Sequence, residues 1–361
     1  MHVALAIDTY DVRKGGAERG VRTLGLALAS RGHRVFLLAA RARDPEPDWT
    51  WVRVRRPLLG RGRRIRVFAS MASRRLGNYG ASVVFGDVPG GSVYLPHGGI
   101  WRAWRRQEIA AAESDREARR ITRAITRSPR QQAARALELA TLQHGRLAGV
   151  IALSRLVERE LKALGCPRPV AVIPNGIALP PPPPPARWHA EPVLLFAAHN
   201  FRLKGLAPFL RILAAAGARG LVAGKGDPKP YRALARSLGI ASKVRFLGPK
   251  ASLEPLFEEA DLLVQPSFYD PCSLTTLEAL ARGMGVVTSG LNGAGELIGE
   301  GAGAVVADPR DTQGFAKAVQ GLLARDRGEV AAAARASAAA VAEPGQTLET
   351  VRQIEAWHGI R

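Results

Sequence analysis

Short apolar runs alternate with longer amphipathic stretches along the whole of this 361-residue chain, and this alternation limits the possible folds more than any other feature. Short runs rich in β-branched residues suit buried strands, and the longer amphipathic stretches suit helices. Strands and helices that alternate in this way build parallel sheets with helices on their faces. Because the length favours two domains and 47% of the residues are apolar, the chain can form two cores. We therefore predict an α/β protein made of two Rossmann-like halves.

The apolar runs place the expected strands. In the first half they fall at residues 3–7, 35–39, 52–54, 82–85, 93–95 and 150–153. In the second half they fall at residues 193–197, 220–223, 243–247, 262–265, 285–288 and 304–306. Between the halves, six consecutive prolines cannot join a helix or an interior strand. We expect a stiff, extended spacer there, and a site for a proline-recognising partner is the alternative.

The proline run also sets the expected domain boundaries. The residues after Asp308 read as helices only, and the last of these helices carries Trp357. A large aromatic side chain near the end of a chain usually packs on another element, so we expect this helix to return to the N-terminal domain. The predicted parts are an N-terminal domain at 1–180, a linker at 181–191, a C-terminal domain at 192–340 and the returning helix at 341–361.

The net charge of +21 is concentrated in the first half of the chain. Residues 1–185 hold 32 Lys and Arg against 14 Asp and Glu, whereas residues 186–361 hold 20 against 17. Such a field attracts polyanions, which include nucleic acids, anionic lipid headgroups and phosphorylated glycans. The charge alone does not choose among these partners.

The sequence predicts a cytoplasmic protein. No apolar run approaches the ~20 residues that a membrane-spanning helix needs. Asp8 and Asp11 follow an apolar run that is too short for a signal peptide. The two cysteines, Cys166 and Cys272, form neither a disulfide framework nor a metal-ligand spacing, which suits a reducing compartment.

Two loops with glycines follow predicted strands of the first half. Gly15 and Gly16 lie between the first strand and the first helix, at the sheet edge where anionic ligands bind in doubly wound folds. The alternative is a turn without a ligand, in which Glu18 complements the helix dipole. His97 ends a later strand beside two glycines, which suits a contact with a substrate hydroxyl or carbonyl. A structural histidine fits that position equally well.

Cations and carboxylates take the equivalent places in the second half. The loop after its first predicted strand carries Arg202 and Lys204, which can neutralise a diphosphate as a metal ion does elsewhere. No D-x-D triad is present to hold such a metal. The loop and helix after its fourth predicted strand carry Asp270 and Glu278, whose carboxylates can accept from sugar hydroxyls on either side of a bound phosphate. A solvated charge pair and an ordinary helix cap are the alternatives.

Residues 101–140 combine tryptophans with a long arginine-rich helix. This combination is expected of a segment that docks on an anionic membrane surface, where a lipid-linked acceptor would be presented. A solvated helical face is the alternative. The docking residues that we expect are Trp101, Trp104, Arg105, Arg106, Arg119, Arg120 and Arg123.

Several segments, taken in chain order, resemble the retaining glycosyltransferases of family 4. They are KGGAER, RGHRV, GVIALSRLVERELKALG, VIPNGI, NFRLKG, AGKGD, VRFLG and ADLLVQPSFYDPCSLTTLEALARGMGVVTS, and the resemblance covers nearly the whole chain. Within that family the chain looks like the lipopolysaccharide core glucosyltransferases. The resemblance implies the GT-B fold, in which two Rossmann-like domains face a cleft. It also implies a nucleotide-sugar donor on the C-terminal domain, an acceptor on the N-terminal domain, and neither a metal nor another cofactor.

The resemblance assigns roles to single residues. Lys204, with Arg202, would hold the diphosphate, and Glu278 would accept from the ribose hydroxyls. His97 and Asp270 would contact the transferred sugar. The remaining donor contacts would come from Gly15, Gly16, Gly224, Gly226, Ser273, Leu274 and Thr275.

Three positions depart from the family pattern. Asp270 stands where the family has the first glutamate of its E-x-x-x-x-x-x-x-E motif, which shortens the reach of the carboxylate by one methylene. Ser273 replaces the usual glycine. Arg202 lies two residues before the lysine, whereas the family has its arginine directly before the lysine or five residues earlier.

These features together predict a metal-independent, retaining hexosyltransferase. It would move a hexose from a nucleotide-diphosphate sugar to a hydroxyl of a glycan or lipid-linked acceptor, in cell-envelope polysaccharide or lipopolysaccharide synthesis. We expect it on the inner face of the cytoplasmic membrane as a peripheral protein, with no nucleic-acid partner. The alternatives are a nucleic-acid- or polyanion-binding protein on a degenerate GT-B scaffold, for which no motif is present, and another GT-B enzyme such as a sugar-nucleotide epimerase.

Overall fold

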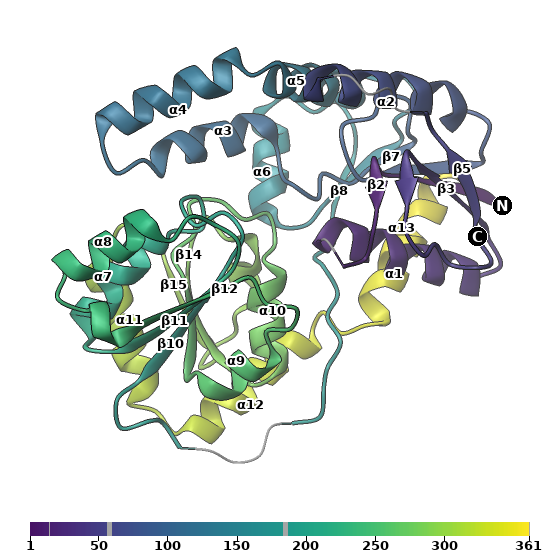
Figure 1. Cartoon of the computed structure of the whole chain (residues 1–361). Coiled ribbons are helices and arrows are strands. Elements are labelled where there is room, and N and C mark those ends of the chain that lie inside the picture. Colours follow the sequence, from purple (N-terminus) through teal and green to yellow (C-terminus); the bar gives the residue numbers. More distant parts are fainter. Residues whose placement is uncertain (14, 56–59, 183–186, 361) are drawn as a thin grey trace. The chain divides into compact units, whose positions relative to one another are not determined.

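The fold is known from a computed structural model, which describes residues 1–13, 15–55, 60–182 and 187–360. The chain divides into two compact units, which we call the N-terminal and C-terminal units (Figure 1). The N-terminal unit comprises Met1–Ile109, Ser114–Gly176 and Pro344–Arg361. The C-terminal unit comprises Ala110–Glu113 and Ile177–Glu343. The boundary between the two units therefore lies before the proline run, between Gly176 and Ile177. The expected linker at 181–191 lies partly outside the described residues.

The N-terminal unit is built on a parallel sheet. In spatial order its strands are β5 (Thr50–Arg53), β3 (Arg34–Ala39), β1 (His2–Ala6), β6 (Ala81–Val84), β7 (Val93–Tyr94), β8 (Gly149–Ala152) and β9 (Val170–Val172). A separate parallel pair joins β2 (Thr9–Tyr10) and β4 (Arg41–Ala42). The helices of this unit are α1 (Gly16–Ser30), α2 (Arg61–Leu76), α3 (Trp101–Ala110), α4 (Asp115–Arg127), α5 (Pro129–Leu142), α6 (Arg155–Ala163) and α13 (Gly345–Trp357).

The C-terminal unit repeats this architecture with its own parallel sheet. In spatial order its strands are β12 (Val244–Gly248), β11 (Arg219–Ala223), β10 (Val193–Ala197), β13 (Leu262–Gln265), β14 (Gly285–Ser289) and β15 (Gly303–Val306). Its helices are α7 (Leu206–Ala216), α8 (Lys229–Ser237), α9 (Glu254–Glu259), α10 (Leu274–Ala281), α11 (Thr312–Leu323) and α12 (Arg327–Ala339), with short 3-10 turns η1 (Ala241–Lys243) and η2 (Gly293–Leu297).

Both faces of the C-terminal sheet are buried, as a doubly wound fold requires. Alternate residues of a strand point to opposite faces. Leu194 and Phe196 of β10 thus belong to one core with residues of α7 and α11. Val193 and Leu195 belong to the other core with residues of α9 and α10. This two-sided burial explains why the strands read as continuous apolar runs in the sequence.

The prediction of an α/β protein with two parallel-sheet domains is confirmed, and each predicted strand overlaps an observed one. The strands β2, β4 and β9 were not predicted, because each has only two or three residues. Both cysteines are free thiols. Among the described residues, no helix combines the length and the apolar character needed to cross a bilayer.

The last helix belongs to the N-terminal unit, where α13 lies beside α1 (Figure 1). The carboxylate of Glu355 accepts two hydrogen bonds from Arg31, at 2.9 and 2.8 Å. It also lies 2.9 Å from Nε2 of His33, at the start of β3. The indole of Trp357 occupies the space beside Gly149 of β8, where a side chain would otherwise stand. The helix begins at Gly345, slightly later than the expected 341.

We predict that Gly149→Ala destabilises the protein by about 1–3 kcal/mol, because overpacking of a filled site forces its neighbours to move. A Cβ at Gly149 would lie 2.4 Å from the nearest ring atom of Trp357. The matched control is Gly145→Ala, because a Cβ there meets nothing within 4 Å. Thermal unfolding of both variants measures the difference. Equal unfolding temperatures would show that the α13 contact does not constrain the unit.

Candidate functional site

The strand order of the C-terminal unit places its predicted site residues at one edge of the sheet. From β10 the chain adds β11 and β12 on one side, and from β13 it adds β14 and β15 on the other side. The direction in which strands are added therefore reverses between the neighbours β10 and β13. The loops that follow β10 and β13 diverge at this point, and ligands of open α/β sheets bind in the resulting crevice. Lys204 lies in the first loop and Asp270 in the second.

The two loops are joined through their backbones. The N–H of Phe268 donates to the carbonyl of Leu203 at 2.8 Å. Next to that bond, Gly205 has a φ of +82°, and a Cβ on it would lie 2.0 Å from the carbonyl oxygen of Pro266. Only glycine permits this approach. Lys204 is therefore held against the loop that carries Asp270.

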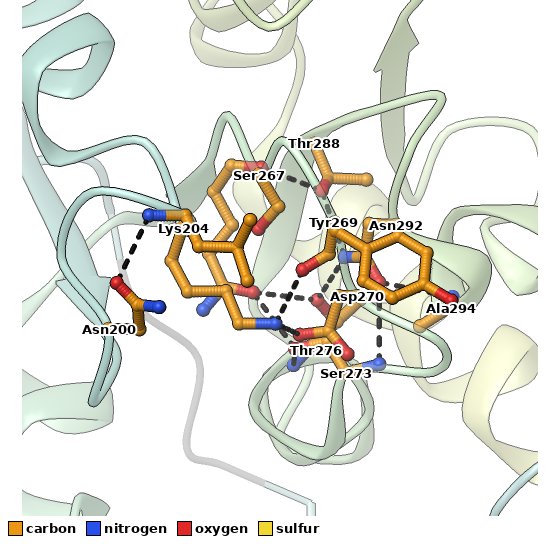
Figure 2. Close-up of polar contacts among 12 residues, drawn as sticks. Asn200, Lys204, Ser267, Tyr269, Asp270, Ser273, Thr276, Thr288, Asn292 and Ala294 are labelled. Atoms are coloured by element: carbon orange, nitrogen blue, oxygen red, sulfur yellow. Dashed lines mark hydrogen bonds and ion pairs between the residues drawn. The ribbon is translucent and has the colours of Figure 1, made fainter. Parts of the chain in front are cut away.

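Lys204 and Asp270 form an ion pair at this edge of the sheet (Figure 2). The distance from Nζ to Oδ2 is 2.7 Å, and Nζ also donates to the carbonyl of Tyr269 at 2.7 Å. Both side chains are mostly shielded, with 20% and 15% of their surface exposed. An ammonium has three donors. The contacts with Asp270 and Tyr269 use two of them, and the third can reach a bound phosphate oxygen.

The N-terminus of α10 lies at the same edge of the sheet, because α10 follows β13 in the chain. Ser273 is its N-cap: its Oγ accepts from the N–H of Thr276 at 3.2 Å and donates to Oε1 of Gln265 at 2.9 Å. The serine that replaces the family's glycine therefore turns its side chain into the unit. The first-turn N–H groups of Leu274 and Thr275 have no acceptor within the helix, so they are the groups that can bind a phosphate.

The other predicted donor residues lie on α10 and in the loops after β10 and β11. Glu278 on α10 and Arg202 in the β10 loop are half-buried. Gly224 has a φ of +135°, and a Cβ on it would lie 1.7 Å from the carbonyl oxygen of Ala198. A Cβ on Gly226 would lie 2.5 Å from the ring of Phe201. Both glycines thus pack the loop after β11 against the loop after β10, and their contact with a donor stays a prediction.

In the N-terminal unit the structure brings His97 close to α1. The ring of His97 lies beside Gly20, with Cδ2 and Nε2 each 3.7 Å from the position of a Cβ on that glycine. Gly15 is the N-cap of α1, and Gly16 is its first residue. The carboxylate of Glu18 lies near Gly15, with Oε2 3.1 Å from the position of a Cβ there. This is the placement expected when Glu18 complements the helix dipole.

The predicted docking residues divide into two groups. Trp101 is half-buried and packs within the unit, since its indole N–H donates to Oε1 of Gln131 on α5 at 2.9 Å. Trp104 and Arg105 are also half-buried. The exposed members are Arg106, Arg119, Arg120 and Arg123. On α4 the opposite face is apolar, and its buried residues are Ile121 and Ile125.

Comparison with known proteins matches both units. Residues 14–179 match the family described as Glycosyltransferase Family 4, and residues 191–325 match the family described as Glycosyl transferases group 1. The chain therefore belongs to the glycosyltransferases that these two families describe. The resemblance predicted from its motifs is thereby confirmed.

Similar proteins include one relative in sequence and two in structure. A D-inositol 3-phosphate glycosyltransferase of Rhodococcus opacus is 34% identical over 149 residues, which are 41% of this chain and 33% of that protein. The match thus spans about a third of that relative's length. The crystal structure of WaaG, a glycosyltransferase involved in lipopolysaccharide biosynthesis, has a TM-score of 0.77 at 20% identity, over 99% of this chain and 100% of WaaG. HepE of Anabaena, in complex with UDP-glucose, has a TM-score of 0.69 at 16% identity, over 99% of each chain.

The protein also desolvates two carboxyl groups that were not predicted from sequence, a buried one at Glu138 and a half-buried one at Asp87. Glu138 on α5 accepts from the backbone N–H of Trp101 at 2.7 Å, so it caps α3 directly after the His97 loop. Burial raises the pKa of Glu138 to about 7. Asp87 follows β6, accepts from the hydroxyl of Tyr94 at 2.9 Å, and has a pKa raised by burial to about 6. Within its helix, Glu138 resembles any surface glutamate, so no sequence signal identified it.

We predict that Glu138→Gln raises the stability of the glycosyltransferase above pH 7. A carboxyl whose pKa is raised from 4.5 to about 7 on folding stabilises the fold below pH 4.5, and this contribution is lost as the pH rises through 7. Glutamine still accepts from the N–H of Trp101 but carries no charge. The unfolding temperature of the variant should therefore exceed that of the wild type at pH 8, and the difference should shrink toward pH 5. The exposed Glu349→Gln on α13 is the control, and parallel profiles for all three proteins would contradict the prediction.

Proposed function

We propose that this chain is a retaining glycosyltransferase that transfers a hexose from a nucleotide-diphosphate sugar to a hydroxyl of a glycan or lipid-linked acceptor. One observation carries the proposal: the Lys204–Asp270 pair lies at the reversal of the C-terminal sheet, beside the loop that leads into α10. A phosphate bound there meets an ammonium and free N–H groups, while a sugar hydroxyl next to it meets a carboxylate. These are the groups that a nucleotide-diphosphate sugar requires.

The chemistry follows from this placement. The bond between the anomeric carbon and the diphosphate oxygen breaks, and its electron pair stays on the diphosphate. Lys204, with Arg202 from the same loop, stabilises that negative charge. The acceptor oxygen then bonds to the anomeric carbon on the face that the diphosphate leaves, so the configuration is retained. The acceptor proton passes to the departing phosphate.

The comparisons support the class of substrate. HepE is similar in fold and was crystallised with UDP-glucose. WaaG is similar in fold and is named for lipopolysaccharide biosynthesis, which favours an acceptor of the cell envelope. Fixed cations and helix N–H groups can stabilise the diphosphate, so we propose that no metal is required.

A donor screen tests the function. Purified protein is incubated with UDP-, ADP-, GDP- and CDP-hexoses and an envelope glycan fraction, with and without chelator, and release of nucleoside diphosphate is measured. We expect turnover with at least one donor, unchanged by the chelator. We predict that Lys204→Ala lowers kcat by about 10²–10³, because it removes a fixed charge aimed at the leaving group. NMR of the product should show the anomeric configuration of the donor.

The exposed Lys317→Ala on α11 is the matched control and should turn over at the wild-type rate. Nucleotide binding without release of diphosphate would favour a polyanion-binding role on the same scaffold. Loss of activity with chelator, or full activity of Lys204→Ala, would overturn the metal-independent mechanism.

We also propose that the exposed arginines of α4 dock the protein on an anionic membrane surface, on the inner face of the cytoplasmic membrane. Arg119, Arg120 and Arg123 are exposed, while the apolar residues of the same helix are buried. Each basic residue close to an anionic surface contributes about 1 kcal/mol, so a few suffice for reversible attachment. Such a surface would also present a lipid-linked acceptor.

Vesicle sedimentation tests this docking. We predict that vesicles with ~30% anionic lipid bind the wild type at low salt and release it at high salt. The double variant Arg119→Glu and Arg123→Glu should bind at least about tenfold more weakly. Arg232→Glu with Arg236→Glu makes the same charge change on α8, again four residues apart and exposed, and should bind like the wild type. Equal binding by both double variants would exclude α4 as the docking element.

A further inference from the structure

A buried asparagine connects the elements that form the proposed donor site. Asn292 lies between β14 and η2, and 2% of its surface is exposed. Its Oδ1 accepts from the N–H of Ser273 at 3.3 Å and from the N–H of Ala294 at 3.2 Å. Its Nδ2 donates to Oγ1 of Thr276 at 3.1 Å and to Oγ1 of Thr288 at 2.9 Å. An asparagine side chain has two acceptor sites and two donors, and all four are used (Figure 2).

The backbone around Asn292 holds Asp270 as well. The N–H of Asp270 donates to the carbonyl of Leu291 at 2.9 Å, and the N–H of Gly293 donates to the carbonyl of Asp270 at 2.8 Å. The backbone of Leu291 and Gly293 thus fixes Asp270, while the side chain of Asn292 fixes Ser273. The segment from Asp270 to Ser273, the N-cap of α10, is therefore held at both ends by residues 291–293.

Gln265 determines which groups of this network donate and which accept hydrogen bonds. Its Nε2 donates to the carbonyl of Ala197 at the end of β10, so its Oε1 is the acceptor for the hydroxyls of Ser273 and Thr276. The hydroxyl of Thr288 donates to the backbone carbonyl of Gln265. Each hydroxyl has one proton, so Thr276 and Thr288 can only accept from position 292. That position therefore requires a donor toward the two threonines and an acceptor toward Ser273 and Ala294.

We propose that Asn292 is a positioning residue for glycosyl transfer, which holds Asp270 and the N-terminus of α10 in the arrangement that binds the sugar and the diphosphate of the donor. It acts through these groups and does not touch the substrate. The inference rests on the proposed function. It predicts that replacing the amide N–H donors at position 292 by an acceptor weakens binding of the nucleotide sugar and catalysis more than it destabilises the fold.

Asn292→Asp is the main test, since it keeps the shape but replaces two donors by acceptors. The carboxylate faces two hydroxyl oxygens whose protons point to Gln265, so either a buried acceptor stays unpaired or the segment from Asp270 to Ser273 shifts. We expect kcat/KM for the donor to fall at least about tenfold, through both kcat and the KM of the donor. The KM of the acceptor should stay unchanged, because the family resemblance implies that the acceptor binds to the N-terminal unit.

The matched control is Ser337→Ala. Ser337 is 8% exposed, lies in the same unit, and its hydroxyl bonds the N–H of Gly299 and the carbonyl of Ala333, away from the site. This variant should unfold at a lower temperature but keep the wild-type kcat and KM for the sugar donor. The same pattern in Asn292→Asp, with wild-type kcat and KM at temperatures where it is folded, would overturn the inference.

A second variant keeps the test decisive if Asn292→Asp does not fold. Thr288→Val keeps the shape of the side chain but removes one acceptor of Asn292, and should raise the donor KM by about threefold to tenfold. Wild-type kinetics in Thr288→Val would then overturn the inference. Failure of the proposed function is distinguishable, because in that case the wild type itself releases no diphosphate from any donor.

Discussion

The hydrogen bond between Phe268 and Leu203 joins the loops that leave β10 and β13, and the site depends on it. At the point where the strand order reverses, these loops run apart, and nothing in the sheet itself brings them together. Gly205 allows the two backbones to touch because a side chain there would collide with Pro266. Lys204 sits between these two contacts, so its ammonium approaches Asp270 without having to order a free loop.

A preorganised site needs its charges fixed before the substrate arrives. Here the fixing is done by polar side chains in places where apolar ones would usually pack. Gln265, Thr276, Thr288 and Asn292 are each at most 2% exposed, and their hydrogen bonds are mutually satisfied. A satisfied buried network specifies one arrangement, because any alternative leaves a polar group unpaired in a low dielectric. Apolar residues could stabilise the fold equally well, but they would not hold the start of α10 in a defined orientation.

The sequence predicted the parts of the site that depend on strand order. Once apolar runs were read as parallel strands, Lys204 and Asp270 had to emerge at one sheet edge, since the carboxyl ends of such strands share an edge. It did not predict Asn292 or Glu138, whose environment depends on elements far apart in the chain. The contact of Trp101 with Gln131 was also missed for this reason, since the two residues lie on different helices.

The two kinds of positive charge in this protein act over different ranges. The arginines of α4 are exposed, and screening by salt limits their influence to about 8 Å at physiological ionic strength. They can attract a charged surface as a whole but cannot distinguish one headgroup from another. Lys204 is mostly shielded and held by two oxygens, so its charge is weakly screened and fixed in direction. The excess of arginine in the first half can therefore act only on a charged surface as a whole, whereas a single fixed lysine in the nearly neutral second half can act on one bound group.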